Sequence, residues 1–180
     1  CLTNVPLLVK PPAGYAVKPR VSDALVELVD VPATIEALTG IEPRHTHFGR
    51  SLLPLVAGEV GDHRDAVFCE GGRLMGERHC AELQSKAYDN PHNLYWPKSE
   101  VQSRETGEHG KATMCRTDRY KYVRRLYEED ELYDLVSDPQ ELDNRVADPA
   151  LGEVLADLKD RTLTWYQETC DAVPWDTDQR

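Results

Sequence analysis

Residues 111–144 constrain the fold more than any other part of this chain, because strand-forming and turn-forming sequence alternate there. Short runs of small, β-branched or aromatic residues predict strands at 112–117, 120–127 and 131–135. Asp118 separates the first two runs with turn chemistry, and proline at 139 ends the sheet because it donates no ladder hydrogen bond. The pattern predicts an antiparallel meander with aromatic residues on both faces.

A helix is expected to cover this meander. Asp148 is suited to cap a helix, and Pro149 fits the first helical position. Seven residues then repeat at helical spacing along one stripe: Leu151, Val154, Leu155, Leu158, Thr162, Trp165 and Tyr166. We expect this stripe to lie against the meander, and the tail from Asp171 to fray.

The N-terminal third has a different pattern. Residues 5–9 form a continuous apolar run, which is typical of a strand buried on both faces of a parallel sheet. Ser22 is placed to cap a helix that a proline interrupts and that ends at Gly40. We therefore expect residues 1–60 to be the end of a larger α/β domain, and residues 61–180 to form an α+β subdomain with a small antiparallel sheet packed on a C-terminal helix.

The region between these two parts is less regular. Residues 65–69 are a further strand candidate. Residues 73–108 show little periodicity, and a loop of that length is either functional or mobile.

The charge balance excludes one class of partner. The net charge of -11 argues against nucleic acid, whose phosphates need clustered lysine and arginine. No stretch reaches the roughly 18 apolar residues of a membrane span, and no signal peptide is visible. The chain begins with cysteine rather than methionine, which indicates a piece of a longer protein or a processed product.

The five cysteines are scattered and odd in number. They contain no C-x-x-C pair, so the pattern is not that of a zinc ribbon or a thioredoxin site. Free thiols in a reducing compartment are the simpler interpretation, which favours the cytoplasm.

Four stretches resemble motifs of the type I sulfatases, which belong to the alkaline phosphatase superfamily. They are RTDRYKYV at 116–123, ELYDL at 131–135, DPQELDN at 138–144 and GRSLLPL at 49–55. The helical segment 26–40 is also similar, although residues 32–34 depart from the usual D-x-x-P-T wording. The resemblance implies that this chain is the C-terminal part of a sulfatase.

The resemblance also implies a reaction for the parent protein. In that family a formylglycine, made from Cys or Ser, attacks the sulfur of an anionic sulfate ester beside a calcium or magnesium ion. The metal and basic side chains balance the charge on the transferring group. The formylglycine and the metal are cofactors of the parent, and a missing N-terminal catalytic domain is the implied partner of this chain.

No residue of this chain is assigned a catalytic or metal-binding role. The nearest match to the nucleophile motif is residues 69–73, where Cys69 and Arg73 have the right separation. The intervening residues do not fit, so we interpret the match as coincidence and Cys69 as a buried strand residue. We expect the chain alone to be inactive.

His109 and Lys111 are the candidate substrate-binding residues. They lie where a loop meets the first predicted strand, and loops on a rigid scaffold concentrate recognition groups. The resemblance implies that this subdomain helps to wall the substrate pocket, where an imidazole beside a lysine suits an anion. The other histidines are interpreted as exposed loop residues: His45, His47, His63, His79 and His92.

Two alternatives stay open. One is a phosphonate or phosphate monoester hydrolase of the same superfamily, which the upstream nucleophile and metal ligands would distinguish. The other is a non-catalytic module that walls a substrate site or stabilises a homo-oligomer.

Overall fold

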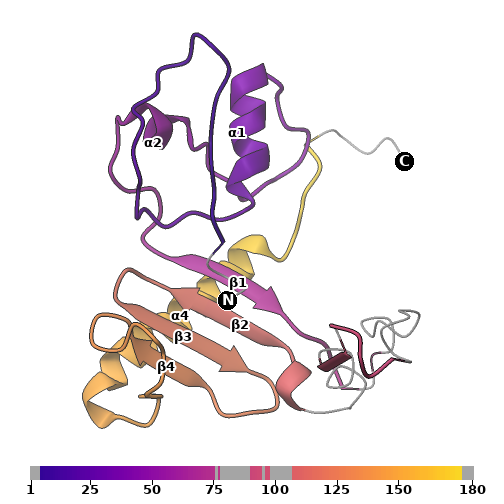
Figure 1. The fold of residues 1–180 in the computed structure, drawn as a ribbon, viewed down its shortest axis with the longest axis vertical. Helices are drawn as coiled ribbons and strands as arrows, with labels where there is room; N and C mark the ends of the chain where they lie inside the picture. Colours follow the sequence, from indigo (N-terminus) through magenta and orange to yellow (C-terminus); the bar gives the residue numbers. More distant parts are fainter. Residues whose placement is uncertain (1–4, 76, 78–89, 95, 98–106, 176–180) are drawn as a thin grey trace.

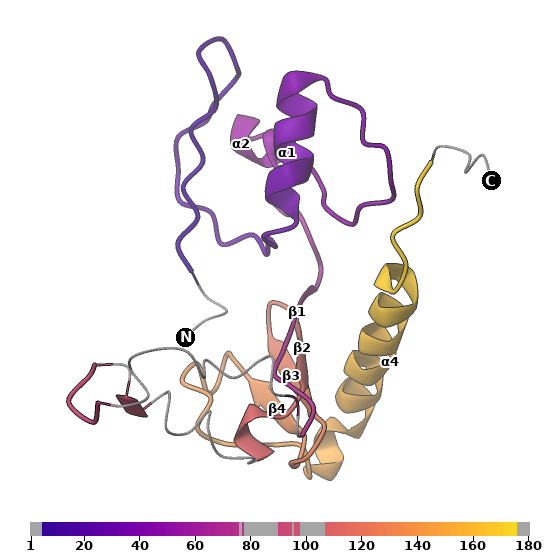
Figure 2. The same ribbon diagram turned by 90° about the vertical axis from the view of Figure 1, so that its right-hand side faces the viewer.

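The computed structural model describes residues 5–75, 77, 90–94, 96–97 and 107–175. These residues form a small antiparallel sheet with a long helix on one face, joined to two short helices set in irregular chain (Figures 1 and 2). The sheet order is β1-β2-β3-β4. Its strands are β1 (Val67–Gly71), β2 (Ala112–Arg116), β3 (Tyr120–Arg125) and β4 (Glu131–Asp134).

The predicted meander is confirmed. Strands β2, β3 and β4 pair in sequence order, and each pair is antiparallel. The turn between β2 and β3 is closed by the amide of Thr117, which donates to the carbonyl of Tyr120 at 2.9 Å. The predicted strand at 65–69 forms two residues later as β1, which pairs with β2 at the edge of the sheet.

The predicted covering helix is also confirmed. A short 3-10 turn (Pro149–Leu151) leads into α4 (Gly152–Thr169), and the carboxylate of Asp148 accepts the amide of Ala150 at 2.8 Å. Figure 2 shows α4 lying along one face of the sheet. The core between them consists of Ala66, Cys115, Tyr122, Leu132 and Leu158.

Aromatic residues extend this contact toward the end of α4. The rings of Phe68 on β1 and Trp165 on α4 stack, with centroids 5.0 Å apart and planes 9° from parallel. The hydroxyl of Tyr166 hydrogen-bonds the hydroxyl of Thr113 on β2. The apolar stripe therefore packs on the sheet as the sequence predicts.

The first predicted helix begins later than expected. Residues 22–29 are not helical, and α1 spans Asp30–Thr39. Pro32 explains the difference, because it lies in the first turn, where amides have no partner within the helix and a missing N–H costs nothing. Gly40 ends α1 in the left-handed conformation, as predicted. A second short helix, α2, spans Leu53–Ala57.

The predicted strand at residues 5–9 is wrong for this structure. These residues have no regular secondary structure, and Leu8 is 95% exposed. A strand needs a neighbour to complete its backbone hydrogen bonds, and no described residue pairs with this run.

The predicted fraying of the tail is wrong for residues 171–175. The amide of Thr46 donates to the carbonyl of Val173 at 2.8 Å, and the amide of Trp175 donates to the carbonyl of Arg44 at 2.9 Å. These bonds tie the segment that follows α4 to the loop after α1 (Figure 1).

Candidate functional site

The sulfatase-like motifs bind one another inside the sheet subdomain. Lys121 of the RTDRYKYV motif forms an ion pair with Glu141 of DPQELDN. Arg119 of the same motif pairs with Asp134 of ELYDL, with the Nη2–Oδ2 distance at 2.8 Å. The side chain of Asn144 accepts the amide of Leu132 at 3.0 Å. These contacts therefore connect the motifs to one another within the subdomain.

Asp130, in the turn before β4, organises a second group of polar contacts. It accepts a hydrogen bond from the hydroxyl of Tyr122 at 2.7 Å and from Nη1 of Arg124 at 2.8 Å. Burial raises the pKa of the Asp130 carboxyl, but these hydrogen bonds outweigh burial and leave its pKa below the usual value. Burial and the Asp130 carboxylate raise the pKa of Tyr122 far above normal, so this hydroxyl is a structural donor.

A buried ionic cluster joins α1 to the segment before β1, and the sequence reading missed it. It consists of Glu27, Asp30, His63 and Arg64. Nε of Arg64 donates to Asp30 at 3.0 Å, and Nη1 lies 3.1 Å from Glu27. His63 was predicted to be an exposed loop residue, but its side chain is only 7% exposed, with Nε2 3.2 Å from Asp30. The prediction for His63 is therefore wrong.

Asp30 also accepts backbone amides from two other segments. The amides of Arg50 and Glu27 donate to its carboxylate at 2.8 and 2.9 Å. Burial raises the pKa of Asp30, but the hydrogen bonds from Arg64 and these amides outweigh it, so its pKa lies below the usual value. The bond from Arg50 joins α1 to the GRSLLPL motif.

Thr34 completes the link between α1 and the GRSLLPL motif. Its hydroxyl accepts the amide of Leu52 at 2.9 Å and donates to the carbonyl of Asp30 at 2.6 Å. The four side chains of the cluster thus each have a partner, and together they connect α1 to the segments that carry Arg50 and Arg64.

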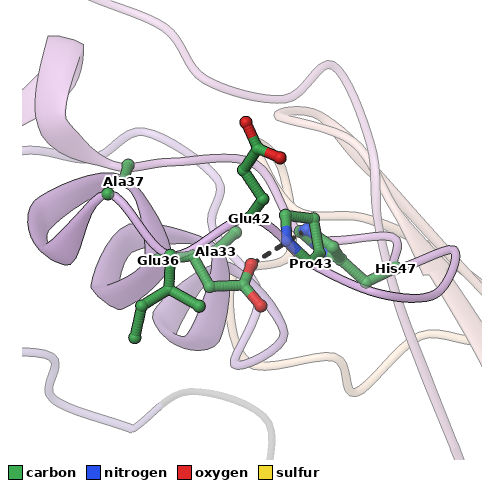
Figure 3. Close-up of a pocket in the computed structure, with 8 residues that line it drawn as sticks. Ala33, Glu36, Ala37, Glu42, Pro43 and His47 are labelled. Carbon is green, nitrogen blue, oxygen red and sulfur yellow. Dashed lines mark ion pairs between the residues drawn. The ribbon is translucent and has the colours of Figure 1, made fainter.

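A shallow hollow of about 430 Å³ lies at the C-terminal end of α1 (Figure 3). Nε2 of His47 lies 3.0 Å from Oε2 of Glu36, close enough for an ion pair but not aligned as a hydrogen bond. Glu42 points away from this pair in Figure 3. The side chain of His47 is 27% exposed, so the prediction that this residue is exposed is wrong. His45 and His92 are exposed, as predicted. His79 lies outside the described residues.

His109 and Lys111 lie at a corner where the end of β1 meets the start of β2. His109 ends a 3-10 turn (Gly107–His109), and its carbonyl accepts the amide of Arg73 at 2.9 Å. The amide of Lys111 donates back to the carbonyl of Arg73 at 3.1 Å. The structure therefore brings both candidates against Arg73, a pairing that the sequence did not predict.

Close backbone packing fixes this corner. Gly72 has a φ of +81°, and a Cβ there would lie 2.1 Å from the carbonyl oxygen of Gly110. A Cβ on Gly110 would lie 2.5 Å from the ring of Tyr127. Among the described residues, Nε2 of His109 has no hydrogen-bond partner although it is buried, whereas Lys111 is exposed.

Three cysteines lie within the described residues, all as free thiols: Cys69, Cys115 and Cys170. Cys69 lies on β1 as predicted but is exposed, so the expectation of a buried thiol is wrong. Cys115 is buried in the core, and burial raises its pKa to about 11. Within the described ranges, no three His, Cys, Asp or Glu side chains come together in a way that could hold a metal ion. In the same part of the chain, no helix is long and apolar enough to cross a membrane.

The chain matches the C-terminal part of sulfatases and phosphonate monoester hydrolases of the alkaline phosphatase superfamily, so the resemblance is confirmed. Among curated proteins it is 28% identical over 172 residues to the multifunctional alkaline phosphatase superfamily protein PehA of Trinickia caryophylli. That alignment covers 93% of this chain and 29% of PehA. No protein-family model matches the chain.

Solved structures of both kinds of enzyme share the fold. The phosphonate monoester hydrolase SpPMH of Silicibacter pomeroyi superposes with a TM-score of 0.59 at 23% identity, over 84% of this chain and 27% of that enzyme. A 2-O GAG sulfatase gives a TM-score of 0.54 at 23% identity, over 79% of this chain and 25% of that enzyme. The chain thus spans less than a third of the length of the proteins that it matches.

Proposed function

We propose that this chain is the C-terminal part of a sulfatase that hydrolyses a sulfate ester, with the catalytic residues upstream. The likeness to the sulfatase fold over 79% of the chain carries the proposal, and the four sequence motifs support it. Residues 1–60 would complete the catalytic α/β domain, and residues 61–180 would form the subdomain beside the substrate. A formylglycine and a calcium or magnesium ion, held by the upstream part, would supply the nucleophile and charge stabilisation.

A phosphonate monoester hydrolase is the second candidate. Two such enzymes superpose with TM-scores of 0.59 and 0.53, on either side of the 0.54 of the 2-O GAG sulfatase, so the fold supports both candidates. The two candidates share this subdomain and differ in the ester that the upstream site accepts.

The exposed N-terminal run supports a missing neighbour. Residues 5–9 are apolar and exposed, and an exposed contiguous apolar patch marks an interaction surface. An upstream catalytic domain would supply strands on both sides of this run and complete its backbone hydrogen bonds.

Turnover by the longer protein tests the proposed function. The longer protein is expected to hydrolyse an aryl sulfate, and the 180-residue chain alone is expected to show no turnover. An aryl phosphonate monoester assayed in parallel distinguishes the second candidate. If the longer protein cleaves neither ester, both enzymatic proposals fail. Light scattering that then showed an oligomer held by this chain would favour the non-catalytic module.

The His109→Ala variant of the longer protein tests the proposed substrate-binding role of the corner. A hydrogen bond to a charged group contributes about 1.5–3 kcal/mol, so we expect kcat/KM to fall roughly 10- to 100-fold, mainly through KM. Lys111→Ala is expected to act in the same direction. The matched control is His92→Ala, at an exposed loop position. Unchanged kcat/KM in both corner variants would remove them from the substrate site.

A further inference from the structure

The face of the sheet opposite α4 carries cations on neighbouring strands. Cys115 and Tyr122 are cross-strand partners that face α4, so their neighbours Arg116 and Lys121, which also pair across β2 and β3, point to the other face. Arg125 lies on that same face, four residues after Lys121. Two like charges placed directly opposite destabilise a sheet unless counter-charges are present.

Counter-charges are present for two of these three cations. Lys121 pairs with Glu141, and Nε of Arg125 lies 2.6 Å from Oε1 of Glu131. Arg116 is different. Its Nε is buried, and within the described residues it has no hydrogen-bond partner. Buried polar groups of this kind are nearly always hydrogen-bonded in native proteins, which indicates that its partner comes from elsewhere.

The side chains around Arg116 are apolar and buried. Its same-face neighbours Val67, Met114 and Val123 are each only 8% exposed, so the side chain of Arg116 lies beside buried apolar groups. A charge beside apolar surface needs a close counter-charge, because water does not solvate it fully. The planar guanidinium fork fits a carboxylate through two parallel hydrogen bonds.

We propose that Arg116 anchors this face of the sheet to the polypeptide upstream of residue 1, by pairing with a carboxylate of that polypeptide. This inference rests on the proposed function, in which the chain is part of a longer hydrolase. The matched proteins are more than three times the length of the aligned segment, so an upstream part of that size would be available. Figure 2 shows the first described residues on the side of the sheet away from α4, which is the side that Arg116 faces.

The test compares two arginines in the longer protein. Arg116→Gln removes the proposed anchor, and the matched control Arg119→Gln removes an arginine that is 59% exposed and paired within the subdomain to Asp134. Limited chymotrypsin digestion measures how fast the junction near residue 5 is cut. We expect Arg116→Gln to accelerate cleavage about tenfold, the control to leave it unchanged, and Arg116→Lys to lie between them. Equal rates for Arg116→Gln and the control would overturn the proposal.

Denaturation of the 180-residue chain alone provides the second arm. Without the upstream carboxylate, Arg116→Gln should not lower the urea midpoint of this chain. A decrease matching that in the longer protein would show a purely internal role and overturn the proposal. Neither measurement depends on turnover. A longer protein that cleaves neither ester would contradict the proposed function. Faster chymotrypsin cleavage of its Arg116→Gln variant would still support the anchor.

Discussion

Replacing Asp30 by asparagine is expected to remove about 3–5 kcal/mol from the free energy of unfolding, the usual effect of removing one partner of a buried ion pair. Asp30 has no exposed surface, and Arg64, with an 8% exposed side chain, would keep its charge without its closest counter-ion. The variant would also weaken the hydrogen bonds that the amides of Glu27 and Arg50 donate to this side chain. Urea unfolding at neutral pH measures the loss.

Asp23→Asn is the matched control for this change. Asp23 is exposed and lies seven residues before Asp30, so the same substitution there should change the unfolding free energy by less than about 0.5 kcal/mol. Equal effects at the two positions would show that the cluster does not stabilise the joint.

The pH dependence of stability gives an independent check on the cluster. Because the pKa of Asp30 is lower in the folded protein than in the unfolded chain, its stabilising effect is present above the unfolded value of about 3.9. This contribution is lost as the pH falls through the lower pKa of the folded state. The stability difference between the protein and Asp30→Asn should therefore shrink below about pH 4. A difference that stayed constant from pH 7 to pH 2 would contradict this account.

Replacing Leu158 by alanine is expected to lower the free energy of unfolding by about 2–5 kcal/mol. Leu158 is 1% exposed and lies between α4 and the core residues Tyr122 and Leu132. The loss combines the transfer free energy of the deleted methyl groups with the cavity that the rigid sheet cannot fill. Urea unfolding should show a lower midpoint with an unchanged slope.

The matched control for Leu158 lies on the same helix. Leu163 is 58% exposed, so Leu163→Ala keeps the change in helix propensity but removes little buried surface. It should alter stability by less than about 0.5 kcal/mol. Similar losses at the two positions would show that α4 is not packed through the face that contains Leu158.

The sulfatase-like motifs identify the fold because they are parts of its internal bonding. Lys121, Arg119 and Asn144 each bind another part of the sheet subdomain. These contacts lie within the subdomain, so the motifs have structural partners there. This explains how a chain with no assigned catalytic residue can carry a specific resemblance to an enzyme family.

The sequence alone determined the parts of this protein that depend on neighbours along the chain. Alternation of side chains predicted β2, β3 and β4, and capping chemistry predicted Asp148 at the start of the last helix. Helical spacing predicted which face of α4 is buried. These features follow from periodicity and local hydrogen bonds, which a single stretch of sequence contains in full.

Only the tertiary structure decided which distant polar groups meet. His63 lies 33 residues from Asp30 along the chain, and Arg73 meets the carbonyl of His109 across a long connection, so no local pattern could pair them. The apolar run at residues 5–9 shows the opposite case, because its composition suits a strand while no described segment pairs with it. A strand or a buried ion pair forms only when the rest of the chain brings its partner within hydrogen-bonding distance.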